Sequence, residues 1–237
     1  MLVILASRHD QFAAAAVGAW APADAALCTP EDLSVAGWQY RIAAPQDAIV
    51  VTGGIVTPAA AITGVWTRLP VVAPEELTHI EFADRAYVAA EMTAFLIAFL
   101  AALRCPVLNR PGFASLSGPG WRQEQWIRAA VRVGVPVRSV RRIVRPDVFL
   151  DRSRDTPDAE LTIIGRRVFG STDVNLTRWA RAISAASNTQ LLSLRFARQG
   201  DGYALVGVNP WPDVSFAGGV DAIRDYLLTA PDTVAAQ

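Results

Sequence analysis

The nine residues Ile62-Thr63-Gly64-Val65-Trp66-Thr67-Arg68-Leu69-Pro70 decide the fold of this chain. Their centre, 65–68, is a short apolar run that closes on an arginine and is stopped by a proline. This pattern is typical of a buried strand in a parallel sheet. Similar runs alternate with helical segments along the first part of the chain, and this order predicts an α/β layer. The other predicted strands lie at 2–6, 49–52 and 107–109, and the predicted helices at 11–20, 84–103 and 120–133.

The chain changes character after about residue 136. Arginines and aspartates crowd the stretch 137–160, which predicts a solvated connection rather than a packed element. Two hairpins and two helices follow, and they predict a small α+β unit. We therefore expect three parts, 1–136, 137–160 and 161–237. The predicted hairpins join 161–164 to 168–171 and 191–197 to 203–208, and the predicted helices lie at 176–187 and 218–228.

All 22 basic residues of the 237-residue chain are arginine, and the formal net charge is zero. Lysine chemistry is therefore excluded, including a P-loop lysine on a phosphate and a Schiff-base lysine. Any bound anion must be held by arginine, by backbone N–H groups or by a helix N-terminus. The neutral overall charge favours neither a nucleic acid nor a membrane as partner.

The apolar run Met92–Leu103 has twelve residues and is too short to span a membrane, which needs about 20. The N-terminal run lacks the basic region of a signal peptide. Two cysteines, Cys28 and Cys105, are far apart in the sequence, and we expect them to be buried free thiols. These features predict a soluble protein of a reducing, bacterial cytoplasm.

Four stretches resemble the ATP-grasp superfamily, and within it the RimK-like and graspetide-type peptide ligases. Residues 62–70 are similar to the "I-x-x-V-W-x-R-x-P" strand of their N-terminal domain, and 105–111 to their "x-x-x-x-N-x-P" strand. Residues 161–169 resemble "R-V-x-V-V-G-x-x-V-F", and 201–210 resemble "D-G-x-x-x-x-E-x-N-P". The resemblance implies a Rossmann-like pre-ATP-grasp domain with a parallel sheet, followed by a small α+β remnant of the ATP-grasp C-terminal domain.

The departures from the family pattern bear on activity. The family's lysine-bearing subdomain would have to fit into 137–160, which contains no lysine. The acidic pair of the family falls on Arg195-Phe196, the glutamate of "E-x-N" falls on Gly207, and Asn209 alone survives. Because Mg²⁺ needs hard carboxylate oxygens, these changes predict a truncated pseudoenzyme. We expect no catalytic residue, no bound metal and no cofactor.

Candidate ligand contacts are Trp66, Arg68 and Arg110, together with Asn209. The first three follow neighbouring predicted strands, at the edge where open α/β sheets bind ligands. Two arginines there can clamp a carboxylate through paired hydrogen bonds. The alternative is a core tryptophan with structural ion pairs to Asp84 or Glu81.

Three functions remain open. The first is a non-catalytic binding or scaffold protein that recognises an acidic peptide, a small carboxylate or a partner protein. The second is a minimal ATP-dependent carboxylate–amine ligase with arginine on the phosphates and Asp201, Asp213 or Asp221 on the metal. The third is a structural subunit of a homo-oligomer. The Arg-rich stretch 137–160 can bind acidic partners, but its aspartates favour a self-neutralised loop.

Overall fold

The computed structural model describes residues 1–21, 24–138 and 157–231. The chain forms two compact units: Met1–Gly120 with Asp213–Gln237, and Trp121–Pro212. These boundaries differ from the predicted parts 1–136 and 161–237. The helix after residue 120 contributes Trp126 to the core of the second unit, whereas the last helix packs on the sheet of the first. The stretch 139–156 of the predicted connection lies outside the described residues.

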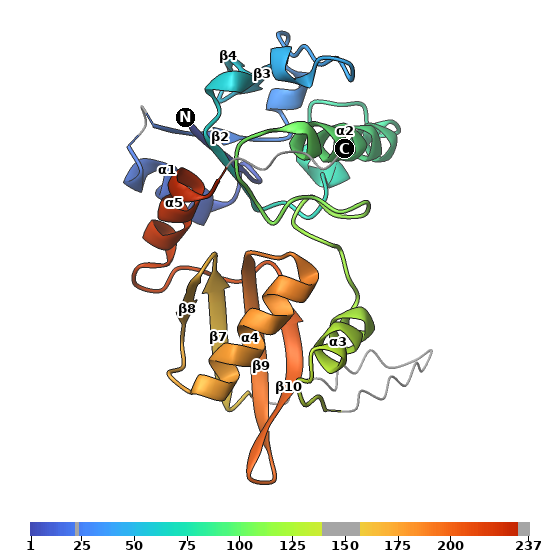
Figure 1. Ribbon diagram of the computed structural model, residues 1–237. Helices are drawn as coiled ribbons and strands as arrows, with labels where there is room; N and C mark the ends of the chain where they lie inside the picture. Colours follow the sequence, from blue (N-terminus) through green and yellow to red (C-terminus); the bar gives the residue numbers. More distant parts are fainter. Residues whose placement is uncertain (22–23, 139–156, 232–237) are drawn as a thin grey trace. The chain divides into compact units, whose positions relative to one another are not determined.

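The first unit contains a parallel sheet of four strands in the order β2-β1-β5-β6 (Figure 1). The predicted strands at 2–6, 65–68 and 107–109 are confirmed, whereas β2 was not predicted because its Ala-rich sequence gives little strand signal. The strands are β1 (Leu2–Leu5), β2 (Ala25–Cys28), β5 (Gly64–Thr67) and β6 (Val107–Leu108).

The predicted strand at 49–52 exists as β3 (Ile49–Thr52), but it does not join the parallel sheet. It pairs antiparallel with β4 (Ile55–Pro58) in a separate two-stranded hairpin. Gly53 and Gly54 connect the two strands with φ values of 57° and 75°. Two successive positive φ angles suit a tight hairpin turn, and this turn reverses the chain at once.

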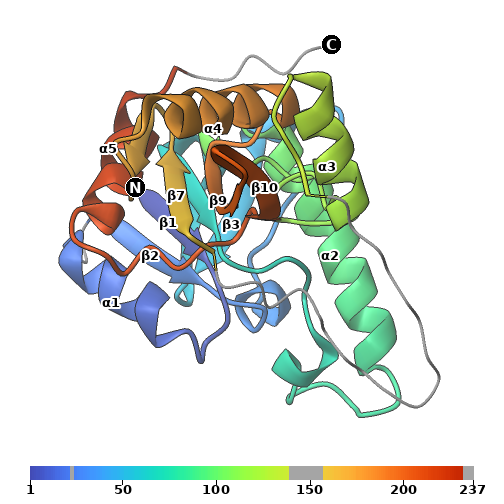
Figure 2. The same cartoon turned by 90° about the horizontal axis from the view of Figure 1, so that it is seen from below.

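Helices cover both faces of the parallel sheet (Figure 2). The helices α1 (Gln11–Ala19) and α5 (Gly219–Thr229) lie on one face, and α2 (Arg85–Ala102) lies on the other. Gly64 permits close approach of α5, because a Cβ atom there would lie 2.9 Å from the Cβ of Leu227. Short 3₁₀ turns occur at Asp32–Ser34, Pro45–Asp47, Ala59–Ala61 and Pro74–Glu76.

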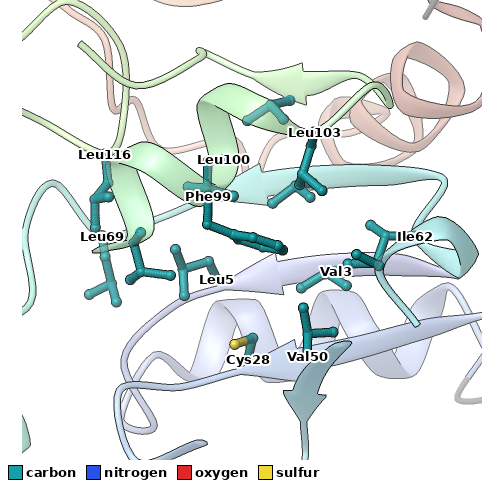
Figure 3. Packing of buried hydrophobic residues seen from close by; sticks show 14 of the residues in the cluster. Val3, Leu5, Cys28, Val50, Ile62, Leu69, Phe99, Leu100, Leu103 and Leu116 are labelled. Atoms are coloured by element: carbon teal, nitrogen blue, oxygen red, sulfur yellow. The ribbon is translucent and has the colours of Figure 1, made fainter. Parts of the chain in front are cut away.

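The core between the sheet and α2 is shown in Figure 3. Val3 and Leu5 of β1 pack against Phe99 and Leu100 of α2, with Cys28 beside them. In the described part of the chain, α2 is the one helix long and apolar enough to cross a membrane by length and composition. Its C-terminal half nevertheless packs into this core, as the sequence predicts.

The second unit is an antiparallel sheet in the order β10-β9-β7-β8, with α3 and α4 packed against one face. Both predicted hairpins are confirmed, and so is the helix at 176–187. The core of this unit includes Trp126 of α3, Ile183 of α4 and Phe196 of β9. The elements are α3 (Gln123–Arg132), β7 (Ala159–Ile164), β8 (Arg167–Phe169), α4 (Val174–Ser187), β9 (Leu191–Gln199) and β10 (Gly202–Asn209).

Candidate functional site

Polar residues gather where the parallel strands of the first unit end. Asp10 follows β1, Arg68 follows β5 and Arg110 follows β6. The carboxyl ends of parallel strands share one edge of the sheet, which is where open α/β sheets bind ligands. The backbones of Arg68 and Arg110 thus follow strands at this edge, and the contacts of each side chain decide what it can do.

Arg68 is held by the protein itself. Its Nε atom donates to Oδ2 of Asp10 over 2.7 Å, and both side chains are largely buried. Its guanidinium carbon also lies 4.9 Å from the ring centre of Phe12 and 5.1 Å from that of Trp66, within cation–π range. The structural ion pair anticipated from the sequence therefore exists, but its partner is Asp10 and not Glu81 or Asp84.

A second carboxylate acts on Arg68. The pKa of Asp213 is lowered, first by the backbone N–H of Ser215, which donates over 2.8 Å, and further by the charge of Arg68. Arg68 thus forms an ion pair with Asp10 and also interacts electrostatically with Asp213. This local balance of charge is unfavourable for an additional acidic ligand at Arg68.

Arg110 binds the C-terminal end of α2. Its Nη1 atom donates to the carbonyl oxygens of Leu100 and Ala101 over 3.0 and 3.2 Å. Its Nη2 atom donates to Leu103 and Cys105 over 2.8 and 2.9 Å. Burial lowers the pKa of the guanidinium, and nearby Cys105 and Tyr226 oppose this shift. Arg110 therefore caps carbonyl groups that the helix leaves unpaired and that favour a cation.

Trp66 is completely buried between α1 and the sheet. Its ring lies 6.0 Å from that of Trp20 and 6.1 Å from that of Phe12, measured between centres. Its indole nitrogen has no hydrogen-bond partner in the described part of the chain. We therefore reassign Trp66 to support of Arg68, and the predicted two-arginine clamp is not assembled because Arg68 and Arg110 bind different elements.

The face of the second unit's sheet that points away from α3 and α4 carries the positions that the sequence aligned with metal ligands. Arg195 of β9 pairs with Gly207 of β10 in the antiparallel register. A Cβ atom on Gly207 would lie 2.7 Å from Nη2, 3.0 Å from Nε and 3.2 Å from Cζ of Arg195. The guanidinium group thus lies flat against the backbone of Gly207, in the space that an acidic side chain would need.

The neighbouring polar groups on this face are partly occupied. Glu160 lies opposite Arg195 on β7, and its Oε1 atom accepts a hydrogen bond from Oγ of Ser193 over 2.5 Å. Asn209 pairs with Ser193, and its Oδ1 atom accepts from the backbone N–H of Trp211 over 2.9 Å. The amide nitrogen of Asn209 has no partner among residues 1–21, 24–138 and 157–231. Asn209 is therefore available as a hydrogen-bond donor.

The residues present do not fit a magnesium ion. Mg²⁺ takes oxygen ligands in near-octahedral geometry, and a guanidinium group in their place repels it. No group of three or more His, Cys, Asp or Glu side chains that could hold a metal occurs in the described ranges. Asp201 lies at the β9–β10 turn, roughly 25 Å along the strand from Asn209. Asp213 and Asp221 belong to the first unit.

No protein-family model and no curated protein matches this chain. Solved structures do match. The macrocyclase MdnC of Microcystis aeruginosa MRC, bound with its precursor peptide MdnA, matches with a TM-score of 0.72 and 10% identity. This match covers 97% of this chain and 100% of MdnC. The chain has the ATP-grasp fold.

Two further ATP-grasp structures agree. A peptide-associated ligase of Chryseobacterium gregarium, in complex with ADP and a leader and core peptide, has a TM-score of 0.66 and 12% identity. The match covers 98% of this chain and 97% of that ligase. A RimK-domain ATP-grasp protein of Sphaerobacter thermophilus DSM 20745 has a TM-score of 0.54 and 17% identity, covering 96% and 99% of the two chains. The resemblance drawn from residues 62–70 and 201–210 is therefore confirmed at the level of the fold.

Sequence reasoning missed two features of these sites. The partner of Arg68 is Asp10, which lies 58 residues away in the sequence, so no local pattern pairs them. The capping role of Arg110 depends on the chain bringing it back to the end of α2, which no local pattern signals. The meeting of Arg195 and Gly207 could have been found, since both lie in predicted strands of one hairpin.

Proposed function

We propose that this ATP-grasp protein is a non-catalytic binding or scaffold protein that recognises an acidic peptide, a small carboxylate or a partner protein. The observation that carries the proposal is the guanidinium of Arg195 lying over Gly207. Phosphoryl transfer depends on positioning and on neutralising the phosphate charges with metal ions. A site with a guanidinium group and a glycine has no carboxylate to bind the metal ions that neutralise the phosphate charges.

The peptide part of the proposal is supported by the structural neighbours. MdnC was solved with a precursor peptide, and the Chryseobacterium ligase with a leader and core peptide. A chain that keeps the fold and loses the metal ligands can keep peptide binding, because binding and phosphoryl transfer use different groups. Asn209 of the second unit remains our proposed contact, whereas Arg68, Arg110 and Trp66 hold together the elements of the first unit.

We also propose a cytoplasmic location. Cys28 and Cys105 are both buried free thiols. Burial raises the pKa of the Cys28 thiol, and the charge of Asp32 raises it further. Two buried free thiols suit a reducing compartment.

A homo-oligomeric subunit is a second candidate, favoured by exposed apolar side chains. Ile42 is 87% exposed, Ile55 is 69% exposed and Val56 is 55% exposed. Ile55 and Val56 lie on the edge strand β4, and an exposed apolar edge readily pairs with another chain. Light scattering coupled to size-exclusion chromatography checks this candidate, and a purely monomeric protein would exclude it.

Calorimetric titration with ATP and Mg²⁺, alongside thermal unfolding, tests the absence of catalysis. We expect neither heat nor a change in melting temperature up to millimolar ATP. A matched titration with ATP in excess EDTA separates metal-dependent from metal-independent binding. Micromolar binding that requires Mg²⁺ would overturn the proposal and favour the minimal ligase.

A further inference from the structure

We propose that a groove between α4 and the β7–β8 turn is a binding site for an oxyanion, a carboxylate or a phosphate, gripped by Arg166 and Arg181. The groove has a volume of about 430 Å³ and lies within the second unit. That volume is in the range of small-molecule sites. The site is separate from Arg195 and Asn209, and it does not depend on the proposed function.

The walls of the groove come from two rigid elements. Arg181 and Ser184 lie three residues apart on one side of α4, and Asn188, the residue that caps its C-terminus, extends this wall. Gly165 and Arg166 form the opposite wall at the β7–β8 turn. The backbone N–H of Gly165 donates to the carbonyl of Gln190 over 2.8 Å, which ties this turn to the segment after α4. The two arginines therefore extend from fixed backbones.

The charge of the groove is positive and uncompensated. Its lining contains Arg166 and Arg181 and no acidic residue. Neither guanidinium has a hydrogen bond or an ion pair to another residue in the part of the chain that the structure describes. Arg178, one turn earlier on α4, is different because its Nη2 atom donates to Oδ1 of Asn175 over 3.2 Å. Two exposed, unpaired guanidinium groups on facing walls suit bidentate binding of an oxyanion.

The end of α4 does not cancel this charge. A helix C-terminus carries about half a negative charge, against two full positive charges here. Its last carbonyls are already satisfied, since the N–H of Asn188 donates to Ala185 and Ser184. The Oδ1 atom of Asn188 accepts from Nε2 of Gln190 over 3.1 Å, so the side-chain NH₂ group of Asn188 is the part left to donate. The lining thus offers an amide donor beside the two arginines.

The test is calorimetric titration of the full chain at low ionic strength with two probes, inorganic phosphate and a hexaglutamate peptide. The variants are Arg166→Ala, Arg181→Ala and the double variant, with Arg178→Ala as matched control on the same helix. All three arginines replaced are exposed, so the variants should unfold at the wild-type temperature. We expect phosphate or the peptide to bind to the wild-type protein. The affinity for that probe should fall at least about tenfold in the double variant, and added NaCl should weaken it.

The outcomes decide the proposal. Binding of phosphate identifies a phosphate-bearing ligand, whereas binding of the peptide identifies acidic side chains as the source of the oxyanion. The absence of binding of both probes, an unchanged affinity in the double variant, or an equal loss in Arg178→Ala would overturn the site. Substitution of Arg195 should leave this binding unchanged, so failure here and failure of the proposed function are distinguishable.

Discussion

The guanidinium group of Arg195 rests on the backbone of Gly207 in the adjacent strand, where a Cβ atom would lie 2.7 Å from Nη2. The two residues depend on each other, because any side chain at position 207 would displace the guanidinium. Together they put a cation and a bare backbone at the two positions that the sequence aligned with metal ligands. The pair thus connects a local packing arrangement to the chemistry that the fold can support.

Replacing both partners should create a cation site. In Arg195→Asp/Gly207→Glu, two carboxylates would face each other across adjacent strands, where paired Cβ atoms lie about 5 Å apart, with Asn209 beside them. We expect weak, millimolar binding of Mn²⁺ or Mg²⁺, measured by calorimetry or by water relaxation for Mn²⁺. Arg195→Asp alone is the control and should bind more weakly. Equal affinities in the wild type and the double variant would contradict this assignment.

Arg110 should contribute to stability. Arg110→Ala removes donors to four carbonyl groups near the end of α2. We expect a loss of about 2 kcal/mol in the free energy of unfolding, measured with urea. Arg110→Lys should recover only part, because an ammonium group cannot reach all four oxygens. Arg104→Ala, at an exposed position close to the same helix end, is the control and should change stability by less than about 0.5 kcal/mol.

Asp10 has two separable roles. Its Oδ1 atom accepts from the N–H of Ala13 and caps α1, while Oδ2 accepts from Arg68. Asp10→Asn keeps a good capping side chain and removes the charge, whereas Asp10→Ala removes both. We expect urea unfolding to show Asp10→Ala as the less stable variant by about 1 kcal/mol. Equal stabilities would show that the cap contributes nothing.

Tyr226 should make the protein sensitive to alkali. Burial raises the pKa of its phenol above the ordinary value of 10.0, and the charge of Arg110 opposes this. The folded state therefore resists ionisation of Tyr226, and its contribution to stability is present below pH 10 and lost as pH rises above it. Tyr226→Phe removes this dependence, so its stability should fall less steeply over the same range. Thermal unfolding at a series of alkaline pH values measures the difference, and identical slopes would argue against it.

Much of the fold could be read from the sequence. The apolar runs at 2–6 and 65–68 predicted strands of a parallel sheet because only buried strands tolerate such runs on both faces. Gly200 and Gly202, between two predicted strands, indicated the turn of a hairpin, because glycine adopts the positive φ angles that tight turns need. The strand at 49–52 was predicted but assigned to the wrong sheet. Its apolar residues indicate that the strand is buried. They do not indicate which other strand it pairs with.

The site could be predicted only in part. The sequence by itself determined that no lysine chemistry is possible and that the strands and helices have an order resembling an ATP-grasp fold. Its alignment of Arg195 and Gly207 with acidic positions of that fold stays a prediction. Each of these depends on residue identity or on local periodicity. The tertiary structure alone decided that Arg68 pairs with Asp10, that Arg110 caps α2, and that Arg166 faces α4. The reason is physical: a guanidinium group on a long side chain binds whichever carboxylate or carbonyl the folded chain brings within reach, and residues distant in sequence meet only after folding.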